Sequence, residues 1–408
     1  MRPSAYIFSL AVYGVSVIPN GIANGVTATP SNFPKLPTHA DSSLIQDDSV
    51  RQGHNRWHDK LTNLANSKVL PSPAFGRSPE TGILVGGGIF YATQLNQDPL
   101  ARKSQISFAG AYTERKQWIL TQSGLLSIGN DRHILQWNLG WRNFFDRYYG
   151  LETEASPEHF IPYRFETYNF HATLLTRIAL SSHFIGPVLR FNSMNHTAWE
   201  EDPTTRQWQR PPGYDGHATV GLGARWVHDT RLQLINPRQG HWYEFAYRMH
   251  PRWSNLNPAY NQWNLDLRRY QPLRNRANPK GPLDDVVWAH RIFLHSAGQG
   301  VSFREMPALG GDNLLRGYFR GYSRGHLTWV IEIELRGMWG KRLGWNLYWG
   351  AGQSGNTWES VVERLPRLSL GGGLRFLPNP SAGTLLRIDY ARTIDGQVGV
   401  YFEVNEAF

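Results

Sequence analysis

The stretch Leu327–Arg336, which reads LTWVIEIELR, alternates between apolar and polar side chains. Leu, Trp, Ile, Ile and Leu occupy its odd positions, and Thr, Glu, Glu and Arg occupy positions 328, 332, 334 and 336. A period of two residues puts each set on its own face of a β-strand. The stretch is therefore predicted to be a strand with one apolar face and one ionic face.

The same alternation recurs in three further stretches towards the end of the chain. They span residues 368–376, 386–392 and 397–408, and the apolar face of the last one comprises Val398, Val400, Phe402, Val404 and Phe408. A soluble β-sandwich also alternates, but its strands need only about 5 to 6 residues. Strands of about 9 to 11 residues with an ionic inner face are typical of a transmembrane barrel. We therefore predict an all-β fold, a transmembrane antiparallel β-barrel with a polar lumen.

About sixteen strands follow from this pattern, and closure of a single-chain bacterial barrel requires an even number. One of them, at 301–309, is short and weak. The predicted strands span residues 81–92, 104–113, 117–128, 132–145, 161–179, 182–193, 215–229, 240–250, 260–271, 286–297, 301–309, 327–339, 343–353, 366–377, 383–393 and 397–408.

The composition agrees with a barrel and not with a helical membrane protein. The chain has 40 Gly, 16 Trp, 18 Tyr and 19 Phe, and no run of about 18 apolar residues follows its N-terminus. The formal net charge of +10 indicates anionic partners, such as lipid phosphates or an acidic polypeptide. Since no helix-turn-helix or RNA-binding signature is present, nucleic acid is not an expected partner.

The first 80 residues differ in composition from the rest. Residues 1–28 contain one basic residue, an apolar run from Tyr6 to Ile18 and then small residues, which predicts a secretory signal peptide. Residues 29–80 are rich in Pro, Ser, Asn and Asp, so they are predicted to be a periplasmic tail or linker with a short helix near 50–66. The barrel is predicted to occupy 81–408. The absence of cysteine is compatible with export but carries little weight.

A glycine-rich loop, Leu309–Gly321, precedes the quoted strand and reads LGGDNLLRGYFRG. Its glycines permit backbone conformations with φ above zero, so Arg316 can be presented at the tip of the loop. A guanidinium held in this way can pair with a carboxylate. The alternative is an ordinary surface turn with a solvated arginine.

Three motifs together resemble the BamA/TamA superfamily of outer-membrane assembly and translocation barrels, also called the bacterial surface antigen family. The first is Leu315-Arg316-Gly317-Tyr318, which matches the family's V-R-G-[FY] with Leu in place of Val. The second is similar to the family's turn between two middle strands and comprises Asp229, Thr230, Arg231, Pro237 and Gly240. The third resembles an insertion signal in the last strand and comprises Gln397, Gly399, Phe402 and Phe408.

This resemblance implies that the long loop folds into the barrel lumen, where Arg316 contacts acidic residues of the inner wall. By parity Glu332, Glu334 and Asp389 face the lumen, and we expect one or more of them to receive Arg316. The family often has an Asp at the position of Gly350, so one expected partner is missing. The alternative is that the three carboxylates only line a solvated pore wall.

The resemblance also implies a lateral seam. The strand with Gly86, Gly87 and Gly88 is expected to be the first strand and to pair with the last one, and glycine weakens strand pairing. In the family, client strands template themselves on the opened seam, which offers unpaired N–H and C=O groups. The alternative is that the glycines only permit curvature.

The function implied by the resemblance is the assembly or translocation of proteins, or of lipids, at the cell outer membrane of a Gram-negative bacterium. The expected partners are outer-membrane lipid and a client or passenger polypeptide, and the barrel is expected to be a monomer. Residues 29–80 show no counterpart of the family's POTRA domains, which recruit clients. A passive, anion-favouring pore or structural barrel is therefore the alternative.

The sequence gives no indication of an enzyme. It contains no G-x-S-x-G elbow and no P-loop. His54 and His58 have helical spacing, but no third ligand is in register with them. We therefore expect no catalytic residue, no metal and no cofactor.

Overall fold

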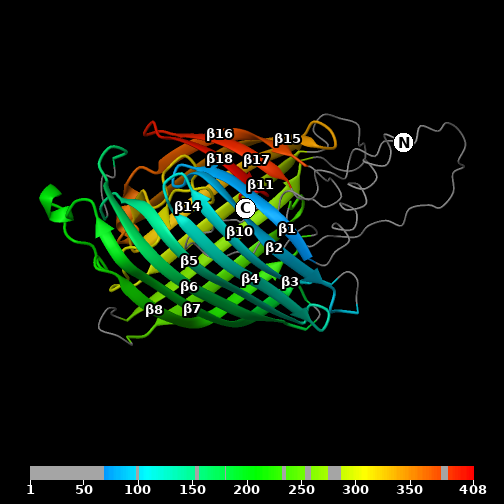
Figure 1. Ribbon diagram of the computed structural model, residues 1–408. Coiled ribbons are helices and arrows are strands. Elements are labelled where there is room, and N and C mark those ends of the chain that lie inside the picture. Colours follow the sequence, from blue (N-terminus) through cyan, green and yellow to red (C-terminus); the bar gives the residue numbers. More distant parts are fainter. Residues whose placement is uncertain are drawn as a thin grey trace, which may run out of the picture.

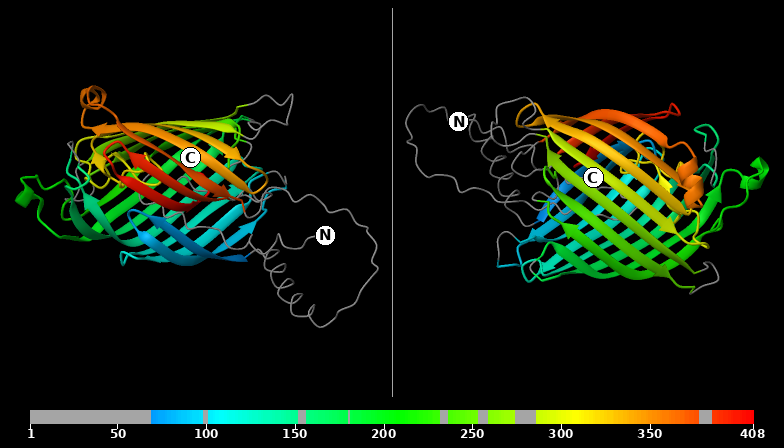
Figure 2. Two further views of the ribbon diagram at one scale, coloured as in Figure 1. Left: turned by 90° about the horizontal axis from the view of Figure 1, so that it is seen from above. Right: turned by 180° about the vertical axis from the view of Figure 1, so that it is seen from behind.

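The computed structural model describes residues 69–97, 101–151, 156–179, 181–231, 236–252, 259–273, 286–377 and 385–408. The predicted signal peptide, the predicted helix near 50–66 and His54 and His58 lie outside these residues. The described segments form a closed antiparallel barrel of sixteen strands, together with a two-stranded ribbon (Figures 1 and 2). The predicted fold, an all-β antiparallel barrel, is therefore confirmed.

The barrel strands follow one another around the wall in sequence order, with β14 next to β11. They are β1 (Val69–Ser78), β2 (Gly82–Thr93), β3 (Ser104–Thr113), β4 (Trp118–Ile128), β5 (His133–Tyr148), β6 (Ile161–Arg177), β7 (His183–Trp199), β8 (His217–Asp229), β9 (Gly240–His250), β10 (Tyr260–Pro272), β11 (Val287–Ala297), β14 (Leu327–Met338), β15 (Leu343–Gly355), β16 (Arg367–Phe376), β17 (Leu386–Thr393) and β18 (Val398–Val404). The ribbon pairs β12 (Ala308–Leu309) with β13 (Ser323–Arg324), and the helical turns are η1 (Pro203–Arg206) and α2 (Trp358–Glu363). Within the described part of the chain, no helix has the length and apolar character needed to cross a membrane.

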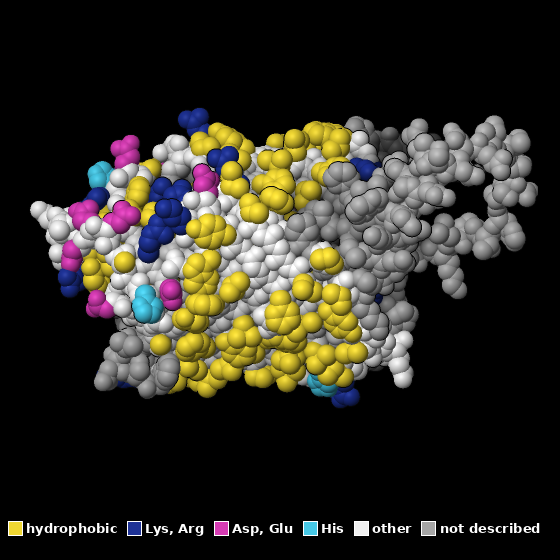
Figure 3. Space-filling model, in the orientation of Figure 1, with side chains coloured by type: hydrophobic (Ala, Val, Ile, Leu, Met, Phe, Trp, Pro, Cys, Tyr) yellow, Lys and Arg dark blue, Asp and Glu magenta, His cyan; other side chains and the backbone are white. Residues whose placement is uncertain are grey.

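The strands present apolar side chains outwards and polar side chains inwards. On β14, Ile331 is exposed, whereas Glu332 and Glu334 on either side of Ile333 are buried. Figure 3 shows hydrophobic side chains spread over the outside of the barrel wall, with charged side chains gathered mainly at one end. An apolar outer surface of this extent is suited to contact with lipid acyl chains.

The two ends of the barrel carry different connections. Since the strands are antiparallel, η1, α2 and the connection from β11 to β14 lie at one end, which we call the loop end (Figures 1 and 2). The turn from β8 to β9 lies at the opposite end, which we call the turn end.

The first barrel strand is β1, which begins at Val69 and not at residue 81 as the sequence predicted. Pro71 and Pro73 lie within it and give the segment the composition of a linker. Proline lacks the N–H group that a fully paired strand donates, so it is confined to edges and weakly paired strands. β1 meets this condition because it pairs with β18 at one position, Arg77 with Phe402.

The strand with Gly86, Gly87 and Gly88 is β2, so the prediction that it pairs with the last strand is wrong. It lies between β1 and β3. A Cβ on Gly86 would come within 2.2 Å of the Gly110 carbonyl oxygen in β3. This glycine therefore permits close strand packing within the wall and takes no part in the seam.

Residues 301–309 do not form a barrel strand, which corrects another prediction. Only Ala308 and Leu309 of this segment are extended, and they pair with β13 inside the β11–β14 connection. The predicted number of barrel strands, about sixteen, agrees with the structure because two errors cancel. The prediction omitted β1 and counted residues 301–309 as a strand.

The segment after β18 turns into the barrel and does not extend the outer face. Asn405 has a φ of 65°, and Phe408 is buried in a cluster with Tyr270 and Ala289 of the inner wall. The Arg336 guanidinium donates a hydrogen bond to the Phe408 carbonyl oxygen at 3.0 Å and lies over its ring. The predicted outward position of Phe408 is therefore wrong, because an inward-facing arginine holds it.

Replacing Leu222 by Arg tests whether the outer wall faces lipid. Leu222 lies mid-way along β8, is 50% exposed and has Leu189 and Met249 as cross-strand neighbours. We expect Leu222→Arg to lower the free energy of unfolding from a bilayer by about 2 to 4 kcal/mol, the cost of arginine on the lipid face near the midplane. Urea titration of vesicle-embedded barrel, followed by tryptophan fluorescence, measures the change. Leu222→Met is the matched control, and equal stability of the two variants would contradict a lipid-facing wall.

Candidate functional site

The connection between β11 and β14, residues 298–326, lies against the inner wall of the barrel, and we refer to it as the lumen loop. Arg304 of the loop pairs with Asp146 of β5, and Glu305 pairs with Arg190 of β7 at 3.0 Å. Arg316 reaches the opposite part of the wall, at β14 and β17. Because all these wall side chains point inwards, the loop crosses the lumen.

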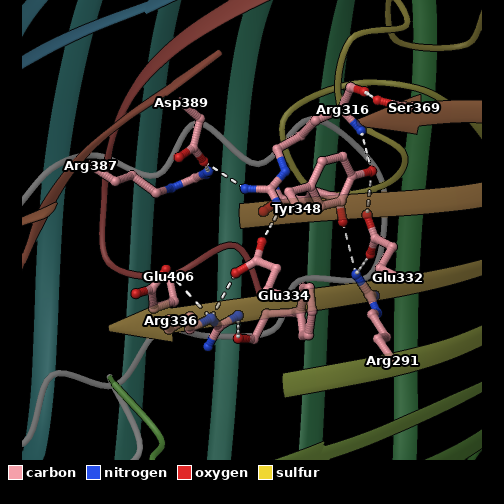
Figure 4. Close-up of polar contacts among 12 residues, drawn as sticks. Arg291, Arg316, Glu332, Glu334, Arg336, Tyr348, Ser369, Arg387, Asp389 and Glu406 are labelled. Atoms are coloured by element: carbon pink, nitrogen blue, oxygen red, sulfur yellow. Dashed lines mark hydrogen bonds and ion pairs between the residues drawn. The ribbon is translucent and has the colours of Figure 1, made fainter. Parts of the chain in front are cut away.

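Arg316 is enclosed by two carboxylates and an aromatic ring. It is 1% exposed. Its Nη1 donates to Asp389 at 2.6 Å, its Nη2 donates to Glu334, and its guanidinium lies 3.9 Å from the ring centroid of Tyr348 (Figure 4). A buried guanidinium is stable only when carboxylates neutralise it, so these contacts are what permits the loop tip to be buried.

Three successive backbone N–H groups of the motif also donate to the wall. The Leu315 N–H donates to Glu332 at 2.9 Å, the Arg316 N–H donates to the Tyr348 hydroxyl at 3.0 Å, and the Gly317 N–H donates to the Tyr401 hydroxyl at 2.9 Å. The Ser369 hydroxyl donates to the Arg316 carbonyl oxygen. The loop tip is therefore held by its backbone as well as by its charge.

Two glycines make room for this packing. Gly317 has a φ of +102°, and a Cβ there would lie 2.9 Å from the Thr393 methyl group. A Cβ on Gly350 would lie 2.4 Å from the Tyr348 hydroxyl. Gly350, where the sequence suggested the loss of an acidic partner, thus admits the phenol that receives the Arg316 N–H.

The carboxylates around Arg316 are shared with other arginines of the wall. Glu334 also accepts from Arg336 at 2.7 Å, and Asp389 also accepts from Arg375 and Arg387, each at 2.5 Å. Further links extend the network to β11 and the C-terminal segment, namely Arg291–Glu332 at 3.5 Å and Arg375–Glu406 at 3.0 Å. One connected network of ion pairs and hydrogen bonds therefore joins the loop tip to β11, β14, β16, β17 and the C-terminal segment.

The structure brings the three candidate carboxylates together at the motif. Glu334 and Asp389 pair with the Arg316 side chain, and Glu332 accepts from the neighbouring backbone. Tyr348 and Tyr401 were not predicted as partners. The sequence did contain a signal for these two contacts, because the alternation of their strands puts both tyrosines on the ionic face. A phenol on that face needs a polar partner inside the barrel.

The predicted turn motif lies at the turn end and is not brought together with Arg316. The Arg231 guanidinium donates to Asp229 at 2.9 Å, and Arg102 lies 3.5 Å from the same carboxylate. Gly240 has a φ of +99°, and a Cβ there would lie 2.5 Å from the Thr230 carbonyl oxygen. Pro237 is buried. This motif therefore closes the β8–β9 connection.

The residues of the predicted insertion signal are divided between the seam and its adjoining turn. The Gln397 N–H donates to the Thr393 hydroxyl at 3.0 Å, and Gly399 pairs with Ala391 in β17. Phe402 is the partner of Arg77 across the seam. Phe408, in contrast, lies inside the barrel.

The lumen loop contacts both sides of the seam. Gly317 donates to Tyr401 of β18, and the Arg320 N–H donates to Glu80 in the β1–β2 turn at 2.9 Å. Glu80 is almost fully buried at this turn, and burial raises the pKa of its carboxyl. The loop therefore bridges the two strands whose pairing closes the barrel.

Known proteins resemble this chain in structure but not in sequence. No family model matches the sequence, and no curated protein matches it either. BamA from Haemophilus ducreyi lacking POTRA domains 1–3 superposes with a TM-score of 0.57 at 15% identity, over 83% of this chain and 70% of that one. CdiB from Escherichia coli superposes with a TM-score of 0.57 at 10% identity, over 83% of this chain and 63% of that one. CdiB from Acinetobacter baumannii gives a TM-score of 0.53 at 14% identity, over 83% and 60%.

At these identities the similarity concerns the fold. The likeness to BamA-type barrels, which the sequence motifs implied, is confirmed at that level. This chain spans less than two thirds of the length of either CdiB chain.

Replacing Arg316 by Ala tests the ionic network. The change leaves Glu334 and Asp389 buried with fewer cationic partners, so we expect the free energy of unfolding to fall by about 3 kcal/mol or more. The temperature at which the folded band disappears on semi-native electrophoresis reports the loss, and Arg316→Lys should recover only part of it because lysine lacks the planar fork.

Arg206→Ala is the matched control for that experiment. Arg206 pairs with Glu201 at 2.8 Å, and both side chains are about one third exposed. An exposed pair contributes about 1 kcal/mol or less. Equal effects of the two substitutions would contradict a stabilising role for the buried network.

Proposed function

We propose that this chain is an outer-membrane barrel of a Gram-negative bacterium that assembles or translocates polypeptides through the seam between β1 and β18. The observation that carries the proposal is the weak closure of this seam. Lipid and a client polypeptide are the partners that the proposal requires, and a single copy of the chain suffices because the seam lies within one barrel.

The pairing of β1 and β18 differs from that of the adjoining strands. In the described residues these two strands pair at one position, whereas β1 pairs with β2 at all ten residues of β1 and β17 pairs with β18 at seven positions. The remaining N–H and C=O groups on the facing edges are a template for another extended chain. This arrangement supports addition of a client strand at the seam.

The lumen loop supports control of that opening. Its tip is fixed to β14 and β17 by Arg316, while Gly317 and Arg320 contact the two sides of the seam. Separation of β1 from β18 would require at least one of these loop contacts to break. The sequence motifs resemble those of the BamA/TamA superfamily, and this resemblance implies assembly or translocation. The likeness in fold to BamA supports the same function.

A passive, anion-favouring pore is the second candidate function. Its support is the positive net charge of the chain and the many arginines of the inner wall. Against it, the lumen loop and the C-terminal segment both fold into the bore. The proposed barrel is therefore closed at rest, and planar-bilayer recordings should show brief fluctuations instead of a steady current.

A disulfide across the seam tests the proposal. The chain has no cysteine, so Arg77→Cys with Phe402→Cys introduces one pair of thiols at the directly opposed positions. We expect vesicles with the reduced variant to accelerate folding of a urea-denatured small outer-membrane barrel, and oxidation to abolish the acceleration, because the locked edges cannot accept a strand.

The matched control places the disulfide between β2 and β3. Val85 and Tyr112 are directly opposed and both exposed on the outer face, so Val85→Cys with Tyr112→Cys should leave client folding unchanged in either redox state. Undiminished client folding with the oxidised seam would contradict the gate. A steady anion-selective current that the lock does not alter would favour the pore.

A further inference from the structure

Arg142 is a buried arginine without a counter-ion. It lies on the inward face of β5 and is 3% exposed. Within the described part of the chain its side chain has no hydrogen-bond or ion-pair partner, and its Nε is fully shielded from solvent. Burial to this degree removes most of the water around the guanidinium, and no described carboxylate takes its place.

Two arginines of the lumen loop, Arg304 and Arg320, act electrostatically on Arg142. The Arg304 guanidinium lies 4.6 Å from the ring centroid of Phe165 in β6, the strand that pairs with β5 beside Arg142. Arg304 pairs with Asp146, and Arg324 lies 4.0 Å from the same carboxylate. Two guanidiniums, those of Arg304 and Arg324, therefore share a single carboxylate, and Arg142 adds a third positive charge on the same inward face of β5.

The fourth arginine of the group does not compensate this excess. Arg320 pairs with Asp312 at 2.5 Å, so that pair is neutral. Arg142, Arg304 and Arg324 therefore carry three positive charges against the one negative charge of Asp146, which leaves an excess of two when each arginine is protonated.

A hydroxyl stands beside the unpaired arginine. Thr167 of β6 is the cross-strand partner of Arg142 and is buried on the same inward face. Guanidinium and hydroxyl groups are among the donors that bind phosphate oxygens in proteins. A carboxylate ligand would neutralise only one charge, whereas a phosphate dianion neutralises two and has oxygens for donors from several directions.

We propose that Arg142 and Thr167 of the wall, together with Arg304 and Arg320 of the lumen loop, bind an oxyanion of the phosphate class that carries two negative charges. The site uses the Arg320 side chain, whereas the contact of this residue with the seam is made by its backbone N–H, and phosphate binding does not depend on client handling. Because it joins β5 and β6 to the loop, a bound phosphate holds the loop on the side of the lumen opposite Arg316.

Equilibrium dialysis of the detergent-solubilised full chain against radiolabelled inorganic phosphate, at constant ionic strength set with chloride, tests the site. We expect saturable binding of about one phosphate per chain. Arg142→Gln should weaken it by about tenfold or more, the loss expected for a hydrogen bond to a charged group. Arg206→Gln, at the exposed η1 turn, is the matched control and should bind phosphate as the wild type does.

Thr167→Val keeps the shape of the site, so it provides a second test if Arg142→Gln does not fold. It should weaken phosphate binding severalfold while the folded electrophoretic band persists. Competition by short-chain phosphatidic acid in mixed micelles would identify a lipid headgroup as the source of the phosphate, and its failure to compete would identify free phosphate. Absence of saturable phosphate binding by the wild type, or equal binding by wild type and Arg142→Gln, would overturn the proposal.

Discussion

The burial of the Arg316 guanidinium is the constraint on which the rest of this structure depends. A charge at that depth requires carboxylates within hydrogen-bonding distance, and Glu334 and Asp389 supply them from two different strands. Those carboxylates in turn need the arginines of β14, β16 and β17 to balance them. The ionic inner face of the wall is therefore explained by the loop it receives, and not only by contact with water.

A network of this kind contributes specificity as well as stability. Buried ion pairs contribute little more stability than apolar packing would. They permit only one arrangement of the side chains, since any shift leaves a charge unpaired. Here the arrangement fixes a loop tip that also touches both sides of the seam through Tyr401 and Glu80. Under the proposed function, the barrel opens at its weakly paired seam while the remaining wall stays intact.

The sequence predicts much of this fold because the alternation of apolar and polar residues is a local property, which can be recognised within each long strand. The Arg316 partners are predicted from two sources: the alternation assigns Glu332, Glu334 and Asp389 to the lumen, and the family resemblance implies that the loop folds in towards them. The prediction fails where tertiary context overrides composition. Pro71 and Pro73 disguise β1 as a linker, and Arg336 draws Phe408 inwards against the alternation. The roles of Tyr348 and Tyr401 depend on which strands meet the loop tip, and spacing along the chain does not contain that information.

The central claim is that the loop tip is anchored to the inner wall by its own backbone and by Arg316. Hydrogen exchange of the Leu315, Arg316 and Gly317 amides in the folded, lipid-embedded barrel tests it most directly, because each of these amides donates to a wall side chain. The account predicts exchange as slow as that of the β14 amides. Exchange as fast as that of the exposed η1 turn would show that the tip is free, and it would contradict the account.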